Sequence, residues 1–246
     1  VRPAETNYKA QWIPQHNRVG TTFAKSQHVY ADDQEITDWT ADHSFRKVKS
    51  IKIEQNLLGV HPDVPKQPFA DIESHVIINE KGVDVYSKIT WLENVTVSGY
   101  GMMFPVYNDF ADRLITSHGN VYDTTITNGS TTDLKENDKA FSYAYMNTSD
   151  HTDGKSDTMA AMSIDNIETT FRYNELGRRQ SGSIVWLQHR NESMQKLYPQ
   201  VYQNHTVAPG DTYEASGRYF VGEMPKDHPL LERVRLASKS TPITLK

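Results

Sequence analysis

The chain has 246 residues, a net charge of −5 and no cysteine, and its 26 basic residues form no long basic run. The absence of cysteine excludes disulfides, thiol chemistry and cysteine-type zinc sites. The negative net charge and the lack of a basic run argue against nucleic acid as a partner, because sequence-independent binding depends on clustered Lys and Arg. No apolar run is long enough to span a membrane, so we expect no membrane insertion.

Hydrophobic residues make up 37% of the chain, but 13 Tyr, 8 Phe and 4 Trp supply enough apolar surface for a sizeable core. The first residue is Val and no signal peptide is present, so we expect a processed product or an excised domain of a larger protein. The lack of cysteine favours a bacterial or viral source over a small secreted eukaryotic domain.

Residues 1–45 are polar and poorly periodic, and we expect an extended N-terminal arm or short strands there. Residues 46–246 are expected to form a single β-sandwich domain. At its start, the alternation of residues 47–58 predicts a strand, and residues 59–68, with three prolines, predict a loop.

The stretch from 83 to 100 indicates the fold class most clearly. Its odd positions are mostly apolar and its even positions mostly polar, which predicts a strand with one packed and one solvated face. We expect a turn before it with Gly82 at a positive φ. Its 18 residues exceed the usual strand of about 5–6, so we expect a bend near Glu93 and Asn94. The solvated parity offers a ligand-facing row of Tyr86, Lys88, Thr90 and Asn94.

The rest of the chain alternates short strand patterns with polar loops, and one short helix is expected at 109–115. Further strand patterns cover 121–127, 140–146, 158–173, 183–190, 194–203 and 207–222. The fold class predicted is therefore all-β: a large antiparallel β-sandwich, supersandwich or jelly-roll-like, with at most one or two short helices.

Two histidines are candidates for catalysis if the chain is an enzyme. A pair of histidines from neighbouring strands can act as acid and base near neutral pH, and His118 and His189 are the two we select. Arg178, Arg179 or Arg190 could then counter a substrate carboxylate. The alternative for each histidine is a surface or hydrogen-bonded structural role.

One acidic loop offers a cation site. Asp150, Asp153 and Asp157 place three carboxylates within eight residues, which could wrap calcium. The loop lacks the bidentate Glu at the spacing of an EF-hand, so a solvated turn is favoured and no cofactor is expected.

The aromatic residues suggest a ligand class. Sugars present apolar C–H faces ringed by hydroxyls, so a Trp or Tyr platform bordered by polar side chains suits them, although most aromatic rings must also fill the core. The candidate ligand-binding residues are Trp91, Tyr100, Tyr107, Trp186, Arg190 and Tyr198.

The C-terminal third carries a Trp-bearing strand, an aromatic-proline stretch, and V-A-P-G-D-T before an alternating strand, all within 183–222. This run resembles the closing strands of carbohydrate-active β-supersandwich domains, with the galactose-mutarotase-like proteins as the reference group. The resemblance implies a domain that binds or acts on sugars, often through His and carboxylate residues in an open concave sheet. In its cysteine-free, Asn-, Thr- and Tyr-rich composition the chain also resembles accessory domains of phage tail and host-recognition proteins.

The leading hypothesis is a carbohydrate-recognising accessory β-sandwich domain, extracellular, at a cell surface or on a virion. One alternative is a carbohydrate-active enzyme, a sugar epimerase or polysaccharide lyase. Another is a structural module of an oligomeric fibre or tail, in which case the chain forms a homo-oligomer.

Overall fold

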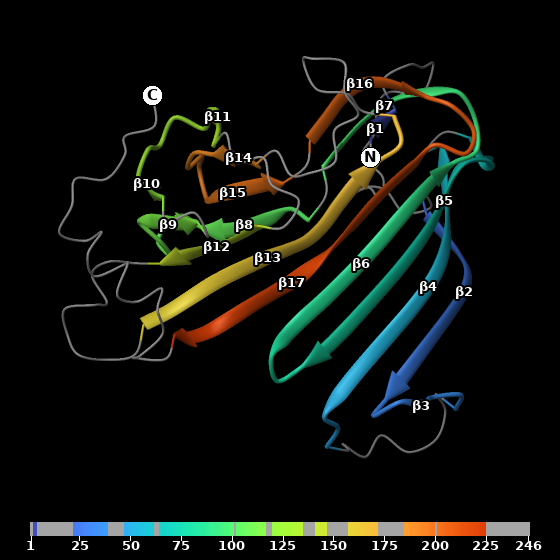
Figure 1. The fold of residues 1–246 in the computed structure, drawn as a ribbon, viewed down its shortest axis with the longest axis horizontal. Coiled ribbons are helices and arrows are strands. Elements are labelled where there is room, and N and C mark those ends of the chain that lie inside the picture. The colour runs from blue at the N-terminus through green and yellow to red at the C-terminus, as the bar shows by residue number, and fades with distance from the viewer. Residues whose placement is uncertain are drawn as a thin grey trace. The chain divides into compact units, whose positions relative to one another are not determined.

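The computed structural model describes residues 2–3, 22–38, 47–61, 64–100, 102–116, 120–134, 141–146, 157–171, 185–199 and 201–224. Their regular structure is β throughout, which confirms the predicted all-β class (Figure 1). The strands are β1 (Arg2–Pro3), β2 (Thr22–Ala31), β3 (Gln34–Glu35), β4 (Ser50–His61), β5 (Val64–Asn79), β6 (Gly82–Trp91), β7 (Val95–Tyr100), β8 (Phe104–Tyr107), β9 (Arg113–Thr116), β10 (Val121–Asp123), β11 (Thr131–Asp133), β12 (Phe141–Met146), β13 (Asp157–Thr169), β14 (Val185–Gln188), β15 (Met194–Pro199), β16 (Val201–Val207) and β17 (Thr212–Met224). The described residues hold no helix long and apolar enough to cross a membrane.

Hydrogen bonding arranges these strands in one large and two small sheets. The large sheet has the order β10-β9-β12-β13-β17-β6-β5-β4-β2-β3, and the small sheets are β1-β7-β16 and β11-β14-β15-β8. The chain divides into two compact units, of which unit 1 comprises Val1–Tyr100, Asn166–Ser181 and Tyr202–Gly217, and unit 2 the remaining residues. The expected boundary after residue 45 lies outside the described residues.

In unit 1, long antiparallel strands pair in register. β5 and β6 form a hairpin whose turn places Gly82 at φ 125°, as predicted from the glycine. The stretch from 83 to 100 breaks after Trp91, and β7 begins at Val95, so the expected interruption near Glu93 and Asn94 is confirmed.

The alternation of this stretch produces one buried parity at the end of β6 and on β7. Ile89 and Trp91 at the end of β6 are buried, and so are Val95 and Val97 on β7. Trp91 is 0% exposed, and its ring lies 5.1 Å from that of Phe171 at 85°. From residue 82 to residue 88 both parities of β6 are partly accessible to solvent, so the predicted packed face is confined to the end of the strand.

Unit 2 contains a sandwich of its own. Phe104 on β8, in the four-stranded sheet, lies 6.4 Å from the ring of Tyr143 and 6.0 Å from the ring of Tyr145, both on β12 of the large sheet. Burial raises the pKa of both tyrosines, because the charged phenolate would lose its water. The residues of this core include Leu114, Met162, Ile164, Val185, Leu187 and Leu197.

The expected helix at 109–115 is wrong. Residues 108–110 form a turn and residues 113–116 form β9, which pairs with both β10 and β12. Leu114 and Ile115 are buried by these partners. Pairing with strands distant in sequence therefore overrides the local helix signal.

The expected loop at 59–68 is also wrong. β4 extends to His61 and β5 begins at Val64, and their pairing shifts register on both sides of Val60. Proline is accommodated at such irregularities because the ladder already lacks a regular hydrogen bond there. Pro65 and Pro68 therefore lie within β5, and Pro68 stands opposite Val60 at the irregular pairing, whereas Pro62 lies outside the described residues.

Candidate functional site

The most distinctive surface of unit 2 is the outward face of its four-stranded sheet. Along β14, Val185 and Leu187 are 0% exposed, whereas the intervening Trp186 and Gln188 face away from the core and are partly accessible. On β15, Gln195 and Leu197 are 0% exposed and alternate in the same way with partly accessible residues. The outward parity of these two strands forms a surface that we call the aromatic platform: Trp186, Gln188, Lys196 and Tyr198.

Strand register brings the platform residues together. Trp186 stands directly opposite Tyr198, and Gln188 opposite Lys196. Directly opposed residues have Cβ atoms about 4.5–5.5 Å apart. The Tyr198 hydroxyl donates to Gln188 Oε1 at 3.0 Å, which fixes both side chains. Two aromatic rings, an amide and an ammonium group therefore share one small area.

Tyr107 adds a third aromatic ring at the edge of this sheet. It ends β8 opposite Met194 of β15 and is 75% exposed. Tyr107, Trp186 and Tyr198 were three of the ligand-binding candidates from the sequence, and the structure places all three on the four-stranded sheet.

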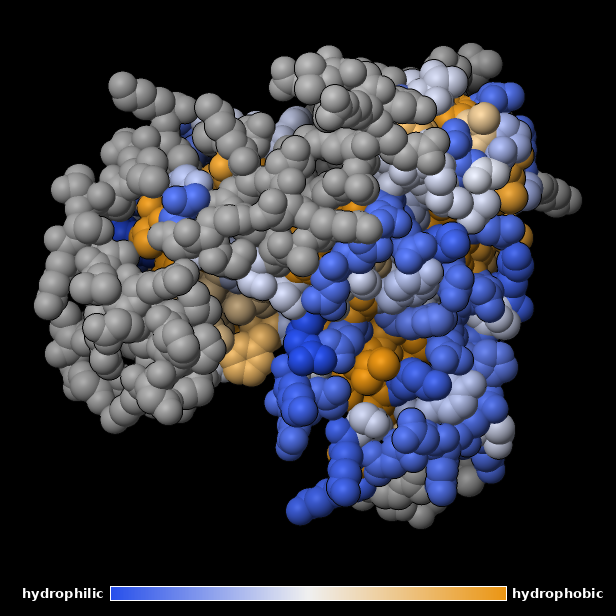
Figure 2. All heavy atoms as spheres, in the orientation of Figure 1, coloured by the Kyte–Doolittle hydropathy of each residue, from blue (hydrophilic) through white to orange (hydrophobic). Residues whose placement is uncertain are grey.

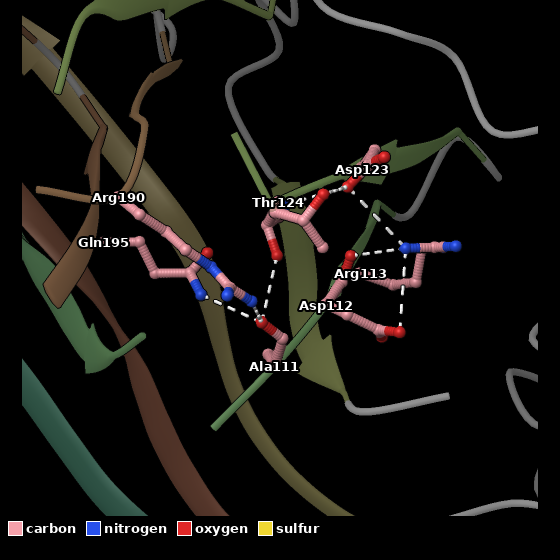
Figure 3. A network of polar contacts seen from close by, with 8 residues as sticks. Ala111, Asp112, Arg113, Asp123, Thr124, Arg190 and Gln195 are labelled. Carbon is pink, nitrogen blue, oxygen red and sulfur yellow. Dashed lines mark hydrogen bonds and ion pairs between the residues drawn. The ribbon is translucent and has the colours of Figure 1, made fainter. Parts of the chain in front are cut away.

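Arg190, another candidate, has a different setting. A network around the carbonyl of Ala111 fixes the segment after β14 to the segment before β9 (Figure 3). The Ala111 oxygen accepts hydrogen bonds from Arg190 Nη2 at 2.6 Å, from Gln195 Nε2 at 3.0 Å and from Thr124 Oγ1 at 3.3 Å. Arg190 thus anchors the segment that follows β14 to the segment that precedes β9.

Beside this network, Arg113 lies between two carboxylates. Its Nη1 atom is 3.7 Å from an oxygen of Asp112 and 3.7 Å from one of Asp123. Burial raises the pKa of Asp123, but hydrogen bonds from Thr125 and the charges of Arg113 and Arg190 outweigh it, so the net pKa is below its usual value. Asp123 therefore stays ionised at neutral pH.

His189 is nearly inaccessible. His189 is 2% exposed, and its backbone N–H donates to the Ser130 carbonyl at 2.9 Å. Burial lowers the pKa of its imidazole, and the nearby charge of Asp123 opposes that shift only in part. The imidazole is therefore neutral at pH 7. Its proposed partner His118 lies outside the described residues, so a His118–His189 pair stays a prediction.

The remaining candidates lie in the core or beyond the described chain. Trp91 belongs to the core of unit 1, and Tyr100 ends β7 with a side chain that is not described. Asp150, Asp153, Arg178 and Arg179 are outside the described residues, as is the side chain of Asp157. Within the described ranges, no group of three or more His, Asp or Glu residues could hold a metal ion, and calcium binding by the acidic loop remains untested.

The sequence did not foresee a polar face on unit 1 that spans four strands. Glu54 stands opposite His28 on one side and His75 on the other, and His75 stands opposite Tyr86. Tyr86, Lys88 and Thr90 of the predicted row lie on β6 and are one strand of this surface, whereas Asn94 lies between β6 and β7. The partners of the row depend on register across strands distant in sequence. Figure 2 shows mostly hydrophilic residues over the region where Figure 1 draws β4, β5 and β6, with an apolar patch among them.

The charges on this face are mutually satisfied. Lys52 Nζ lies 3.0 Å from Glu54 and 4.1 Å from the ring centre of Tyr30. The hydrogen bond from Lys52 is the main cause that lowers the pKa of Glu54. His75 lies 3.2 Å from Glu73. The arrangement is that of a solvated, ion-paired sheet face.

These features describe a β-sandwich protein with an aromatic platform. No family model matches the chain, and no curated protein matches it. Among solved structures, it is similar to the GH36 α-galactosidase AgaA A355E D478A from Geobacillus stearothermophilus in complex with stachyose, at TM-score 0.46 and 7% identity. It is also similar to the GH36 α-galactosidase AgaB of that organism, at TM-score 0.44 and 7% identity. Each match covers 82% of this chain, which spans 28% of the matched chain.

Proposed function

We propose that this chain recognises carbohydrate through the aromatic platform of unit 2, at a cell or virion surface. The observation that carries the proposal is the pairing of Trp186 with Tyr198 on the outward face of the sheet, where the inward neighbours Val185, Leu187 and Leu197 are 0% exposed. An aromatic pair in that position is not needed to fill the core.

The chemistry of the platform fits a sugar. The ring faces of Trp186 and Tyr198 offer apolar area to the C–H groups of a pyranose. The Gln188 amide and the Lys196 ammonium, on the same parity, can hydrogen-bond to hydroxyls. Because neighbouring inward residues are 0% exposed, the strands that present these groups are firmly packed.

The proposal is tested with the full chain on an array of oligosaccharides, followed by calorimetric titration of a glycan that binds. Trp186→Ala is expected to weaken binding at least about tenfold, equal to about 1.4 kcal/mol. Tyr30→Ala, which removes a partly buried tyrosine from unit 1, is the matched control and should leave affinity unchanged.

Two outcomes would overturn the proposal: no binding to any sugar, or binding that Trp186→Ala leaves intact. The enzyme hypothesis predicts a different result in the same experiment. If the glycan is cleaved or isomerised and turnover falls in the double variant His118→Ala, His189→Ala, the chain is an enzyme.

A further inference from the structure

Lys196 brings a positive charge to the aromatic platform. It lies near the middle of β15, on the outward parity of the four-stranded sheet, and is partly accessible to solvent. Within β8, β14 and β15, its neighbours on that face are all uncharged: Trp186, Gln188, Pro105, Tyr107, Met194 and Tyr198. The residues that surround the ammonium group in the sheet therefore do not neutralise it.

This setting differs from that of three lysines in unit 1. Lys25, Lys52 and Lys88 each have a carboxylate oxygen within 3.8 Å of Nζ. Among the residues that the structure describes, no carboxylate lies at ion-pair distance from Lys196. Asp133 of β11 shares the outward parity, because it stands opposite Trp186. Its backbone is two strands and one row away from that of Lys196, about 12 Å, which is beyond the Debye length of about 8–10 Å.

The other polar group of the platform also favours an acceptor as ligand. Gln188 Oε1 already accepts the hydrogen bond from the Tyr198 hydroxyl at 3.0 Å, and Gln188 Nε2 donates to the Gly129 carbonyl at 3.5 Å. The amide keeps the second hydrogen of Nε2 for a ligand. A ligand on the platform therefore meets two donors, one of them charged, and a charged donor binds an anionic acceptor most strongly.

Arg190 does not supply this charge. Its Nη2 atom donates to the Ala111 carbonyl at 2.6 Å, and its Nε atom is buried. Lys196, by contrast, stands diagonally from Trp186, a relation in which the two residues are about 7–8 Å apart. A sugar stacked on the Trp186 ring therefore has one edge beside the Lys196 ammonium.

On the basis of carbohydrate recognition by the platform, we propose that its ligand is an acidic sugar, a pyranose that carries a carboxylate or a sulfate. The C–H face of the sugar packs on Trp186 and Tyr198, and its anionic group accepts a hydrogen bond from Lys196. Both anions fit, because an ammonium is a compact point charge without the planar fork of arginine. The whole chain has a net charge of −5 and does not attract polyanions in general, so the preference comes from the position of Lys196.

The test is a calorimetric comparison of acidic oligosaccharides with neutral counterparts that differ from them only in charge. Oligomers of galacturonate, mannuronate and glucuronate are paired with their carboxyl-reduced forms, and sulfated galactan oligomers with their desulfated forms. At least one acidic member should bind the full chain about fivefold more tightly than its counterpart, the upper range for an accessible ion pair. Salt at about 1 M, where the Debye length is about 3 Å, should reduce this difference.

Substitution of Lys196 should act on the acidic member alone. Lys196→Gln is expected to lower the affinity for the acidic sugar to that for its neutral counterpart, which stays unchanged. Lys196→Arg keeps the charge and should retain the preference. Lys25→Gln is the matched control, since it removes a charge from an exposed lysine of unit 1 and should leave both affinities as they are. Trp186→Ala should weaken both members by the same factor.

Two results would overturn the acidic sugar and leave carbohydrate recognition intact. One is a neutral oligosaccharide that binds as tightly as its acidic counterpart, and the other is a preference for the acidic member that persists in Lys196→Gln. Failure of every oligosaccharide to bind, acidic or neutral, would contradict carbohydrate recognition as well. A preference shown by carboxylates alone, or by sulfates alone, supports the acidic sugar and identifies its anion.

Discussion

Trp186 and Tyr198 stand directly opposite each other on β14 and β15, on the outward face of the four-stranded sheet. The Tyr198 hydroxyl is held by Gln188, two residues after the tryptophan. Their inward neighbours Leu187 and Leu197 are also opposite each other, and both are 0% exposed. One register therefore produces a packed core on one side and an aromatic surface on the other.

Substitutions at two adjacent residues of β14 should affect stability and glycan binding to different extents. Leu187→Ala removes a fully buried side chain and is expected to lower the free energy of unfolding by about 2–5 kcal/mol. Trp186→Ala should lower it less and weaken glycan binding more. Urea denaturation and calorimetry on both variants measure the two effects. The opposite ranking would place Trp186 in the core and contradict the platform.

The Ala111 network should make a measurable contribution to stability. Arg190→Ala removes a charged donor 2.6 Å from the Ala111 oxygen, and we expect a loss of about 1.5–3 kcal/mol. Lys25→Ala is the control, since Lys25 lies 2.9 Å from Asp71 but both side chains are well exposed. Such a pair contributes about 0–1 kcal/mol. Equal losses in urea denaturation would show that the network is not needed.

Burial of His189 should make stability depend on pH in a defined window. Its folded pKa lies below the usual 6.5, so the unfolded chain takes up the proton first as pH falls. The stabilising contribution of the neutral ring is therefore complete above pH 6.5 and decreases as pH falls from there toward the folded pKa.

The test is urea midpoints at pH 7 and pH 5 for the native chain and for His189→Gln. The native chain should lose more stability between these values than the variant does. The lowered pKa of Asp123 acts in a separate window, because that contribution is lost only at pH values below the usual 3.8. Identical pH dependence in both proteins would contradict a buried neutral imidazole.

Two glycines of the same sheet should respond differently to alanine. Gly82 has φ 125°, a conformation that strains any L side chain, so Gly82→Ala is expected to destabilise unit 1 by about 1–3 kcal/mol. A Cβ atom at Gly59 would meet its nearest neighbours at an ordinary 3.5 Å. Gly59→Ala should therefore be neutral or stabilise by up to about 1 kcal/mol. Thermal unfolding compares them, and equal effects would contradict the positive φ at Gly82.

Local sequence patterns predicted what depends on neighbouring residues. The alternation of 83–100, the turn at Gly82 and the break before Val95 each follow from side-chain period and glycine chemistry within a few positions. The helix predicted for 109–115 is wrong because β9 is held in place by its pairing with β10 and β12. Tyr145 of β12 stands opposite Leu114 of β9 and follows it by 31 residues in the sequence, so a local pattern carries no sign of this pairing. The loop predicted for 59–68 is wrong because proline occurs at irregular strand pairings as well as in loops.

The candidate sites show the same limit. The sequence identified Trp186, Tyr198 and Tyr107 as residue types suited to sugars, but their common sheet follows from register alone. Trp91 was chosen as a ligand-binding candidate only because it is aromatic, and it is buried because of its parity on β6.

The most direct test of carbohydrate recognition is the indole N–H spectrum of the full chain during titration with a bound glycan. The four tryptophans give four signals, and Trp186→Phe and Trp91→Phe assign the two that matter. Recognition through the platform predicts that the Trp186 signal shifts to saturation while the signal of the buried Trp91 stays in place. A glycan that binds and leaves the Trp186 signal unmoved would contradict it.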